Sequence, residues 1–173
     1  MGVLYDYFAA SGDAEAALAI DRPGGPGQPA RSAPAKREGI FSRRQHVDDH
    51  GHQPTFQTVA DTGIDPVVTG GTLEELLTGR PYAQIARDAR SGHALAVRDD
   101  GERLVLTLTD GLVDALAEAT PERLGAIAVP WSGTEEFMGA GDPEQLESLL
   151  LDLSALARDA RAGGGSVYCW VSV

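Results

Sequence analysis

The stretch 142-DPEQLESLLLDLSALARDARAGGGSVYCWVSV-173 joins the clearest helical pattern of the chain to its clearest strand pattern. Asp142 is a typical N-cap, a proline is tolerated in the first helical turn, and residues 163–165, all glycine, end the helix. The last residues, 166–173, carry β-branched or aromatic side chains at most positions, which predicts a strand that is central or covered on both faces. The apolar side chains of the helix recur at three- and four-residue spacing: Leu146, Leu149, Leu150, Leu153, Leu156, Ala157 and Ala160.

Working outward, the other end of the chain predicts a second aromatic strand at residues 2–8, GVLYDYF, and we expect the two end strands to pair. The segment 93-HALAVRDDGERLVLTLTD-110 predicts a hairpin around the turn RDDG. Its second strand is apolar on both faces, so it should be central. The segment 70–80 predicts a helix that begins with a capping box of Thr72 and Glu75.

The order of these elements is neither a regular alternation of strands and helices nor a repeat. We therefore predict an α+β fold, in which a small mixed or antiparallel sheet is packed by several helices against one side. The N- and C-terminal strands and the central hairpin form that sheet. Further helices are predicted at residues 11–21, 81–90, 109–119 and 120–129, with Pro130 ending or bending the last one.

The chain of 173 residues has the length of a single domain, residues 1–173, interrupted by an insertion at 21–53. This insertion is dense in Pro, Gly, Ala and Ser and lacks apolar periodicity, so we predict that it is flexible. The single cysteine, Cys169, excludes an internal disulfide and lies in an apolar run, where a core role is expected.

The net charge of −12 argues against a nucleic acid partner, because phosphate contacts need clustered Lys and Arg, and favours a protein partner with a basic surface. The charge is uneven: residues 22–44 hold six basic side chains and one acidic one. No signal peptide and no apolar stretch of about 20 residues is visible, so we expect a cytoplasmic protein without a membrane partner.

Three histidines and two aspartates stand close together in 46-HVDDHGH-52, and all five side chains are competent metal ligands. His46, His50 and His52 are the candidate ligands. The cluster stands at the end of the predicted flexible insertion and lacks the glutamate of the H-E-x-x-H arrangement. A solvated loop is therefore the main interpretation, with adventitious or designed metal binding as alternatives. No cofactor is predicted.

A second candidate is the turn 130-PWSGTEEFMGAGD-142, where aromatic residues stand beside acidic ones. Trp131, Glu135, Glu136 and Phe137 are the predicted partner-binding residues, since aromatic anchors with acidic neighbours suit a basic partner. The alternatives are that Trp131 and Phe137 anchor the turn in the core, or that the two glutamates perform acid–base chemistry. Outside the insertion only His93 could serve as a histidine base, and no nucleophile motif accompanies it.

The segments MGVLYDYF (1–8), GIDPVV (63–68), WSGTEEFMG (131–139) and LARDARAGGGSVYCWVSV (156–173) resemble a family of small actinobacterial proteins of unknown function. That family is distantly similar to the YfbM-like group of bacterial domains of unknown function. The resemblance covers both ends of the chain and much of the region after Phe56. It implies an intracellular bacterial α+β domain, and it assigns no activity or catalytic residue.

Together these features predict an acidic, non-enzymatic protein-interaction domain that acts as small immunity or inhibitor proteins do. The alternative is a small metal- or carboxylate-dependent enzyme that acts on an unknown small molecule.

Overall fold

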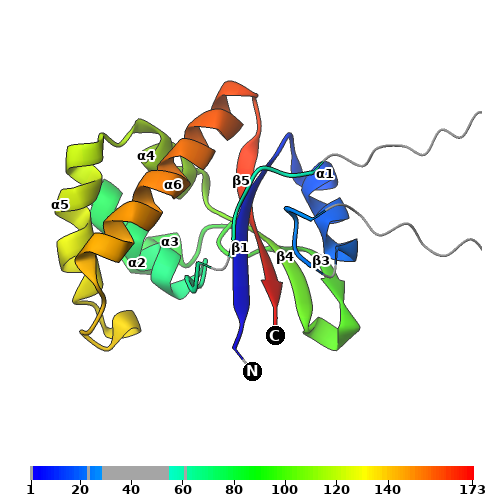
Figure 1. Cartoon of the computed structure of the whole chain (residues 1–173), viewed down its shortest axis with the longest axis horizontal. Helices are drawn as coiled ribbons and strands as arrows, with labels where there is room; N and C mark the ends of the chain where they lie inside the picture. The colour runs from blue at the N-terminus through cyan, green and yellow to red at the C-terminus, as the bar shows by residue number, and fades with distance from the viewer. Residues whose placement is uncertain (1, 23, 29–54, 61) are drawn as a thin grey trace, which may run out of the picture.

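The computed structural model describes residues 2–22, 24–28, 55–60 and 62–173. Its centre is an antiparallel sheet of five strands in the order β2-β1-β5-β4-β3 (Figure 1). The α+β prediction is therefore confirmed, and so is the pairing of the two end strands. The strands are β1 (Leu4–Ala10), β2 (Thr58–Val59), β3 (Ala94–Arg98), β4 (Arg103–Thr107) and β5 (Ser166–Ser172).

The helices lie on both sides of this sheet. On one side α6 crosses β1 and β5, α4 and α2 pack beside it, and α5 is the outermost element (Figure 1). On the other side α1 packs on the hairpin of β3 and β4. The helices are α1 (Asp13–Ala17), α2 (Val68–Thr78), α3 (Tyr82–Ile85), α4 (Asp110–Glu118), α5 (Pro121–Ser132) and α6 (Pro143–Ala162), and the 3-10 turns are η1 (Leu18–Asp21), η2 (Asp99–Gly101) and η3 (Glu135–Phe137).

Alternation along β5 explains why both faces of the sheet are covered. Cys169 and its neighbours at 167 and 171 point into the large core under α4 and α6, whereas Tyr168 and Trp170 point into a smaller core with Phe8 and Phe56. All of these side chains are buried. The prediction that helices cover one side only was wrong, because a strand that is apolar on both faces needs a second layer.

Part of that second layer comes from the start of the predicted insertion. Arg22 is buried there and donates hydrogen bonds through Nη1 to the carbonyl oxygens of Pro26 (2.9 Å) and Gln28 (3.1 Å). Its guanidinium lies 4.6 Å from the ring centre of Phe56. Residues 24–28 therefore have a defined path over the sheet, and the rest of the insertion, 29–53, lies outside the described residues.

The capping box predicted at Thr72 was also wrong. The helix α2 begins at Val68, and Asp65 Oδ1 accepts hydrogen bonds from the backbone N–H groups of Val67 and Val68. Thr72 lies inside the helix and donates its hydroxyl to the carbonyl of Val68. By contrast, the predicted caps Thr109 of α4, Thr120 of α5 and Asp142 of α6 are all present.

Candidate functional site

The predicted partner-binding residues divide into a buried pair and an exposed pair. Trp131, at 0% exposure, lies inside the core at the end of α5 and donates its indole N–H to the carbonyl of Thr69 in α2. This is the alternative in which Trp131 anchors the turn in the core: α5 continues past Pro130 to Ser132 and carries the indole inward. Phe137 is half-buried against it, and Glu135 and Glu136 are exposed.

The residues after α5 form a closed turn, 133–141, which we call the Met138 turn. Its backbone is held by hydrogen bonds from Met138 N to the carbonyl of Glu135 (2.8 Å) and from Gly141 N to that of Ser132 (3.2 Å). A Cβ at Gly141 would lie only 2.9 Å from the Ser132 carbonyl oxygen, so glycine permits this close return of the chain. The turn thus has one well-defined backbone path.

The side chain of Met138 at the tip of this turn points into solvent and is 90% exposed. Its backbone is left-handed, with φ of 53°, a conformation that side chains other than Gly, Asn and Asp seldom adopt. The surrounding hydrogen bonds therefore hold an apolar side chain outward in an unfavourable backbone conformation. Such local strain is often found at binding sites.

The two glutamates of the turn have different partners. Glu136 accepts a hydrogen bond from the Thr72 hydroxyl at 2.7 Å, and this bond lowers the pKa of its carboxyl group. It ties the turn to α2 and keeps the carboxylate ionised. Glu135 is exposed as well. Both carboxylates therefore present their charge at the surface, and Glu136 is the one fixed in position by Thr72.

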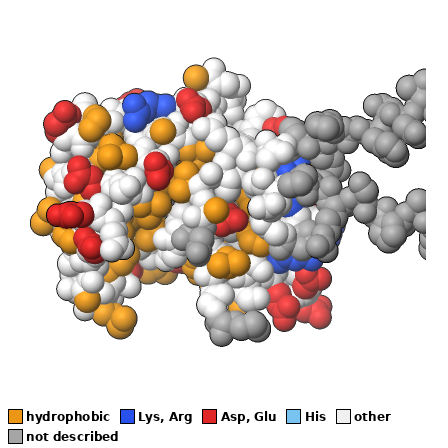
Figure 2. Space-filling view, viewed as in Figure 1, with side chains coloured by type: hydrophobic (Ala, Val, Ile, Leu, Met, Phe, Trp, Pro, Cys, Tyr) orange, Lys and Arg blue, Asp and Glu red, His pale blue; other side chains and the backbone are white. Residues whose placement is uncertain are grey.

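The helices near the Met138 turn are negatively charged, as the turn itself is. Residues 110–162 contain eleven acidic and three basic side chains, a net charge of −8. Acidic groups are spread over the side of the molecule formed by α5 and α6 (Figure 2). A further apolar side chain, Val129 of α5, is 62% exposed on this helical side. Hydrophobic side chains gather between these acidic groups (Figure 2), so the surface combines apolar and acidic side chains.

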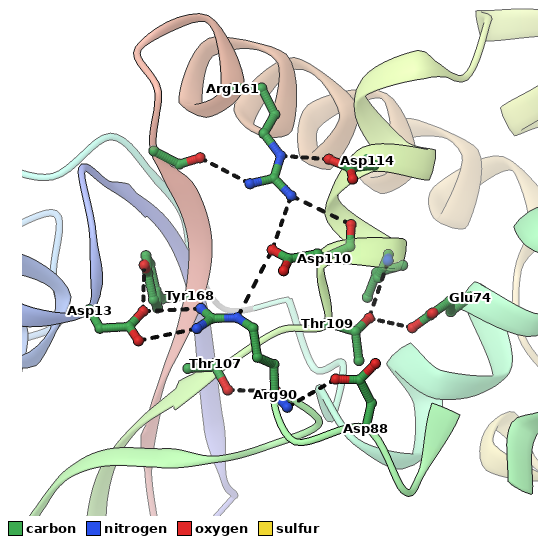
Figure 3. Close-up of polar contacts among 12 residues, drawn as sticks. Asp13, Glu74, Asp88, Arg90, Thr107, Thr109, Asp110, Asp114, Arg161 and Tyr168 are labelled. Carbon is green, nitrogen blue, oxygen red and sulfur yellow. Dashed lines mark hydrogen bonds and ion pairs between the residues drawn. The ribbon is translucent and has the colours of Figure 1, made fainter. Parts of the chain in front are cut away.

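A second polar cluster, which the sequence reasoning missed, lies at the end of the sheet where β5 begins (Figure 3). Asp13 of α1 accepts two hydrogen bonds from the Arg90 guanidinium (3.0 and 3.1 Å) and one from the Tyr168 hydroxyl (2.9 Å). The hydrogen bonds from Arg90 are the main cause of the lowered pKa of Asp13. Burial, followed by the bond to Asp13, raises the pKa of Tyr168 to about 12.

The cluster continues across the sheet end to the helical side. Asp110, the first residue of α4, lies between Arg90 (4.0 Å) and Arg161 of α6 (3.2 Å). Arg161 also binds Asp114 at 2.7 Å. The cluster therefore links α1 on one face of the sheet to α4 and α6 on the other. Each guanidinium has a carboxylate, so the arrangement is that of a structural clamp, with its charges compensated internally.

A buried carboxylate, that of Glu74 in α2, lies beside this clamp (Figure 3). It accepts hydrogen bonds from the Thr109 hydroxyl and, at 3.4 Å, from Arg80. A Cβ at Gly111 would lie 2.5 Å from Glu74 Oε1, so a larger residue there would displace this carboxylate. Glu74 therefore joins the start of α4 to α2.

A cavity of about 390 Å³ lies between α2, α4 and α5, within the size range of small-molecule sites. Its charged lining is Asp114, Glu118 and Arg123, and Arg123 donates to the carbonyl of Leu77 at the end of α2. Neither Glu135 nor Glu136 lines it. The carboxylates proposed for acid–base chemistry and this cavity are therefore separate features.

The metal-site prediction cannot be placed, because His46, His50 and His52 lie outside the described residues. Within the described ranges, no three His, Cys, Asp or Glu side chains are grouped so as to hold a metal ion. His93, the other histidine, is exposed just before β3. In the same part of the chain, no helix combines the length and the apolar character that a membrane span requires.

No protein-family model matches this chain, and no curated protein or solved structure does. The resemblance to the actinobacterial family stays a prediction. Function must therefore be inferred from the chain's own residues.

Sequence reasoning selected the Met138 turn but not Met138 itself. The available signal was the pair Met138-Gly139, which follows Glu135, Glu136 and Phe137 and places an apolar residue next to a glycine in a turn. The clamp at the sheet end gave no local signal, because Asp13, Arg90 and Tyr168 are far apart in the sequence and meet only through the sheet pairing.

Proposed function

We propose that the protein is an acidic, non-enzymatic interaction domain that binds a basic protein partner through the Met138 turn and the neighbouring helical surface. The observation that carries this proposal is Met138, an almost fully exposed apolar side chain held in a left-handed backbone conformation. A rigid turn loses little conformational entropy when it binds, which favours affinity. A cytoplasmic location is part of this proposal.

The side chain of Met138 and the residues around it indicate the chemistry of the partner. An apolar pocket would accept the methionine side chain, whose flexible thioether adapts to irregular shapes. A basic rim would face Glu135 and the acidic side chains on the side formed by α5 and α6. Trp131 and Phe137 support the turn from beneath, and Glu136 anchors it to α2. In this assignment only Glu135 of the originally predicted residues is a direct contact, and Met138 is added.

The proposal can be tested by affinity purification from the source organism with matched variants. Met138→Asp should lose a basic partner that the wild-type protein retains, because a charge replaces the apolar anchor. Val97→Asp is the control, since Val97 is also exposed but lies on β3, on the far side of the molecule from α5. Equal recovery of the same partner by both variants would exclude the Met138 turn as the contact.

A carboxylate-dependent enzyme is the second candidate, and the cavity between α2, α4 and α5 is the observation that favours it. Glu118 in its lining would be the acid–base group, rather than Glu135 and Glu136, and Asp114 beside it is ion-paired with Arg161. A small amine or other cationic molecule would suit these carboxylates. Thermal-shift screening of wild type against Glu118→Gln tests this candidate, because a ligand of the cavity should stabilise the wild type more strongly.

A further inference from the structure

The chain contains three sulfur atoms, in Met1, Met138 and Cys169. Cys169 lies on β5, and its side chain is fully buried. Burial also raises the pKa of its thiol, so the reactive thiolate form is absent from the folded protein at neutral pH. Met1 lies outside the described residues. Among the described sulfur atoms, an oxidant dissolved in water can therefore reach that of Met138 alone.

The thioether of Met138 is accessible without any movement of the chain. Its side chain is 90% exposed, while the aromatic rings of the turn, Trp131 and Phe137, pack against each other. Hydrogen bonds from Met138 N to the carbonyl of Glu135 (2.8 Å) and from Gly139 N to that of Thr134 (3.2 Å) hold this conformation. The turn thus presents the sulfur to solvent in the folded state, and not only after local unfolding.

The residues next to Met138 determine which kind of oxidant can approach. Glu135 and Glu136 carry negative charge, and the carboxylate of Glu136 is held by Thr72. These charges repel anionic oxidants but not an uncharged molecule such as hydrogen peroxide. In the reaction a lone pair of the Met138 sulfur attacks one peroxide oxygen, and the O–O bond breaks. The sulfur is oxidised by two electrons and keeps that oxygen as a sulfoxide, while the second oxygen leaves as water with both peroxide protons.

We propose that Met138 is an oxidation site, and that its conversion to the sulfoxide by peroxide abolishes binding by the Met138 turn. The loss of binding rests on the proposed function, in which an apolar pocket of the partner accepts the thioether. The sulfoxide is polar, so its entry into such a pocket costs the desolvation of its oxygen. The fold is unaffected, because an exposed side chain contributes little to the core. Methionine sulfoxide reductases reverse the modification, so oxidation regulates the turn reversibly.

Peroxide treatment of the full chain, followed by peptide mass spectrometry, tests the chemical step. We expect Met138 to be oxidised in the folded protein at a rate within about twofold of its rate in urea, because folding does not shield it. Cys169 in the same samples is the internal reference, and folding should slow its oxidation at least about tenfold. Oxidation of Met138 should shift the Tm by less than about 2 °C. Protection of Met138 similar to that of Cys169, or unfolding when Met138 is oxidised, would overturn the proposal.

Affinity purification with the oxidised protein tests the loss of binding. Oxidised wild type should retain at least about tenfold less of the basic partner than reduced wild type, and treatment with methionine sulfoxide reductases should restore binding. Met138→Leu is the control, because it keeps an apolar side chain and Met1 but lacks the oxidisable sulfur, so it should retain the partner after peroxide treatment. Met138→Gln, with a polar side chain of similar length, should lose the partner without peroxide.

The variants also separate the failure of this proposal from that of the proposed function. If Met138→Asp and oxidised wild type both retain the partner, the Met138 turn is not the contact, and both proposals fail. If Met138→Asp loses the partner while wild type with a confirmed sulfoxide at position 138 retains it, the proposed function stands and regulation by oxidation is wrong. Loss of the partner from peroxide-treated Met138→Leu would place the sensitive group elsewhere and would overturn the assignment of Met138.

Discussion

The ring of Phe137 meets the indole of Trp131 edge-on, with the ring centres 5.2 Å apart and the planes at 87°. This contact joins the Met138 turn to the core, because Trp131 is buried and Phe137 lies between it and the solvent. Edge-to-face pairs of this kind add stability beyond their buried area. The turn therefore depends on Trp131 for its shape, while Met138 remains free for a partner.

Trp131→Ala should strongly destabilise the protein, because it removes a fully buried indole and its hydrogen bond to Thr69. The expected loss in the free energy of unfolding is about 3–5 kcal/mol, measured by urea denaturation. Val129→Ala, at an exposed position of the same helix, should change it by less than about 0.5 kcal/mol. Similar values for the two variants would contradict the burial of Trp131.

Met138→Gly should leave the free energy of unfolding unchanged or raise it by up to about 1 kcal/mol, because glycine adopts the left-handed conformation without strain. Ala155→Gly, at an exposed position of α6, should lower it by about 1 kcal/mol. The same Met138→Gly variant should lose the partner. A Met138→Gly protein that keeps its stability but loses the partner would show that Met138 serves binding and not folding. A lower free energy of unfolding for Met138→Gly would contradict the strain argument.

Asp13→Asn should reduce stability at neutral pH but not in acid. The bonds from Arg90 lower the pKa of Asp13 in the folded protein, so its stabilising effect is present above the unfolded pKa, near 4, and is lost as pH falls through the lower folded value. Thermal unfolding of both proteins from pH 7 downward should show curves that converge below about pH 4. A difference that persists in strong acid would exclude ionisation as the cause.

The hydroxyl of Tyr168 should lose its proton at a higher pH than that of an exposed tyrosine. Burial and the bond to Asp13 raise its pKa to about 12, so the difference in tyrosinate absorbance between wild type and Tyr168→Phe should develop near that pH. Because the folded pKa is above the unfolded value of about 10, the contribution of Tyr168 to stability is present below pH 10 and disappears as pH rises toward 12. A difference spectrum centred near pH 10 would show that the hydroxyl is not held by the clamp.

The parts of the fold that could be predicted are those whose signal is local. Asp142 begins α6 and the turn after Arg98 joins β3 to β4 as expected, because capping and hairpin chemistry involve residues close in sequence. Thr72 was wrongly chosen as a cap because the capping-box pattern of Thr72 and Glu75 was the only start signal considered. The helix begins four residues earlier, at Val68, where Asp65 accepts from the backbone, and it includes the buried Gly70 and Gly71.

The position of the Met138 turn in the chain could be predicted, but the directions of its side chains could not. Composition indicated an aromatic and acidic turn, and the structure has one, but helix periodicity carries Trp131 inward while the left-handed backbone turns Met138 outward. No pattern in the sequence predicts a positive φ at a methionine. The prediction for the histidine cluster stays untested, because His46, His50 and His52 lie outside the described residues.

The most direct test of the interaction proposal places a photo-activated cross-linking side chain at position 138 in the source organism and, in a matched strain, at position 102 on the β-hairpin. We expect one basic protein to be captured from position 138 and not from position 102, and Glu135→Arg in the first protein to reduce that capture. The same set of captured proteins from both positions, unaffected by Glu135→Arg, would contradict the assignment of the Met138 turn as the partner-binding surface.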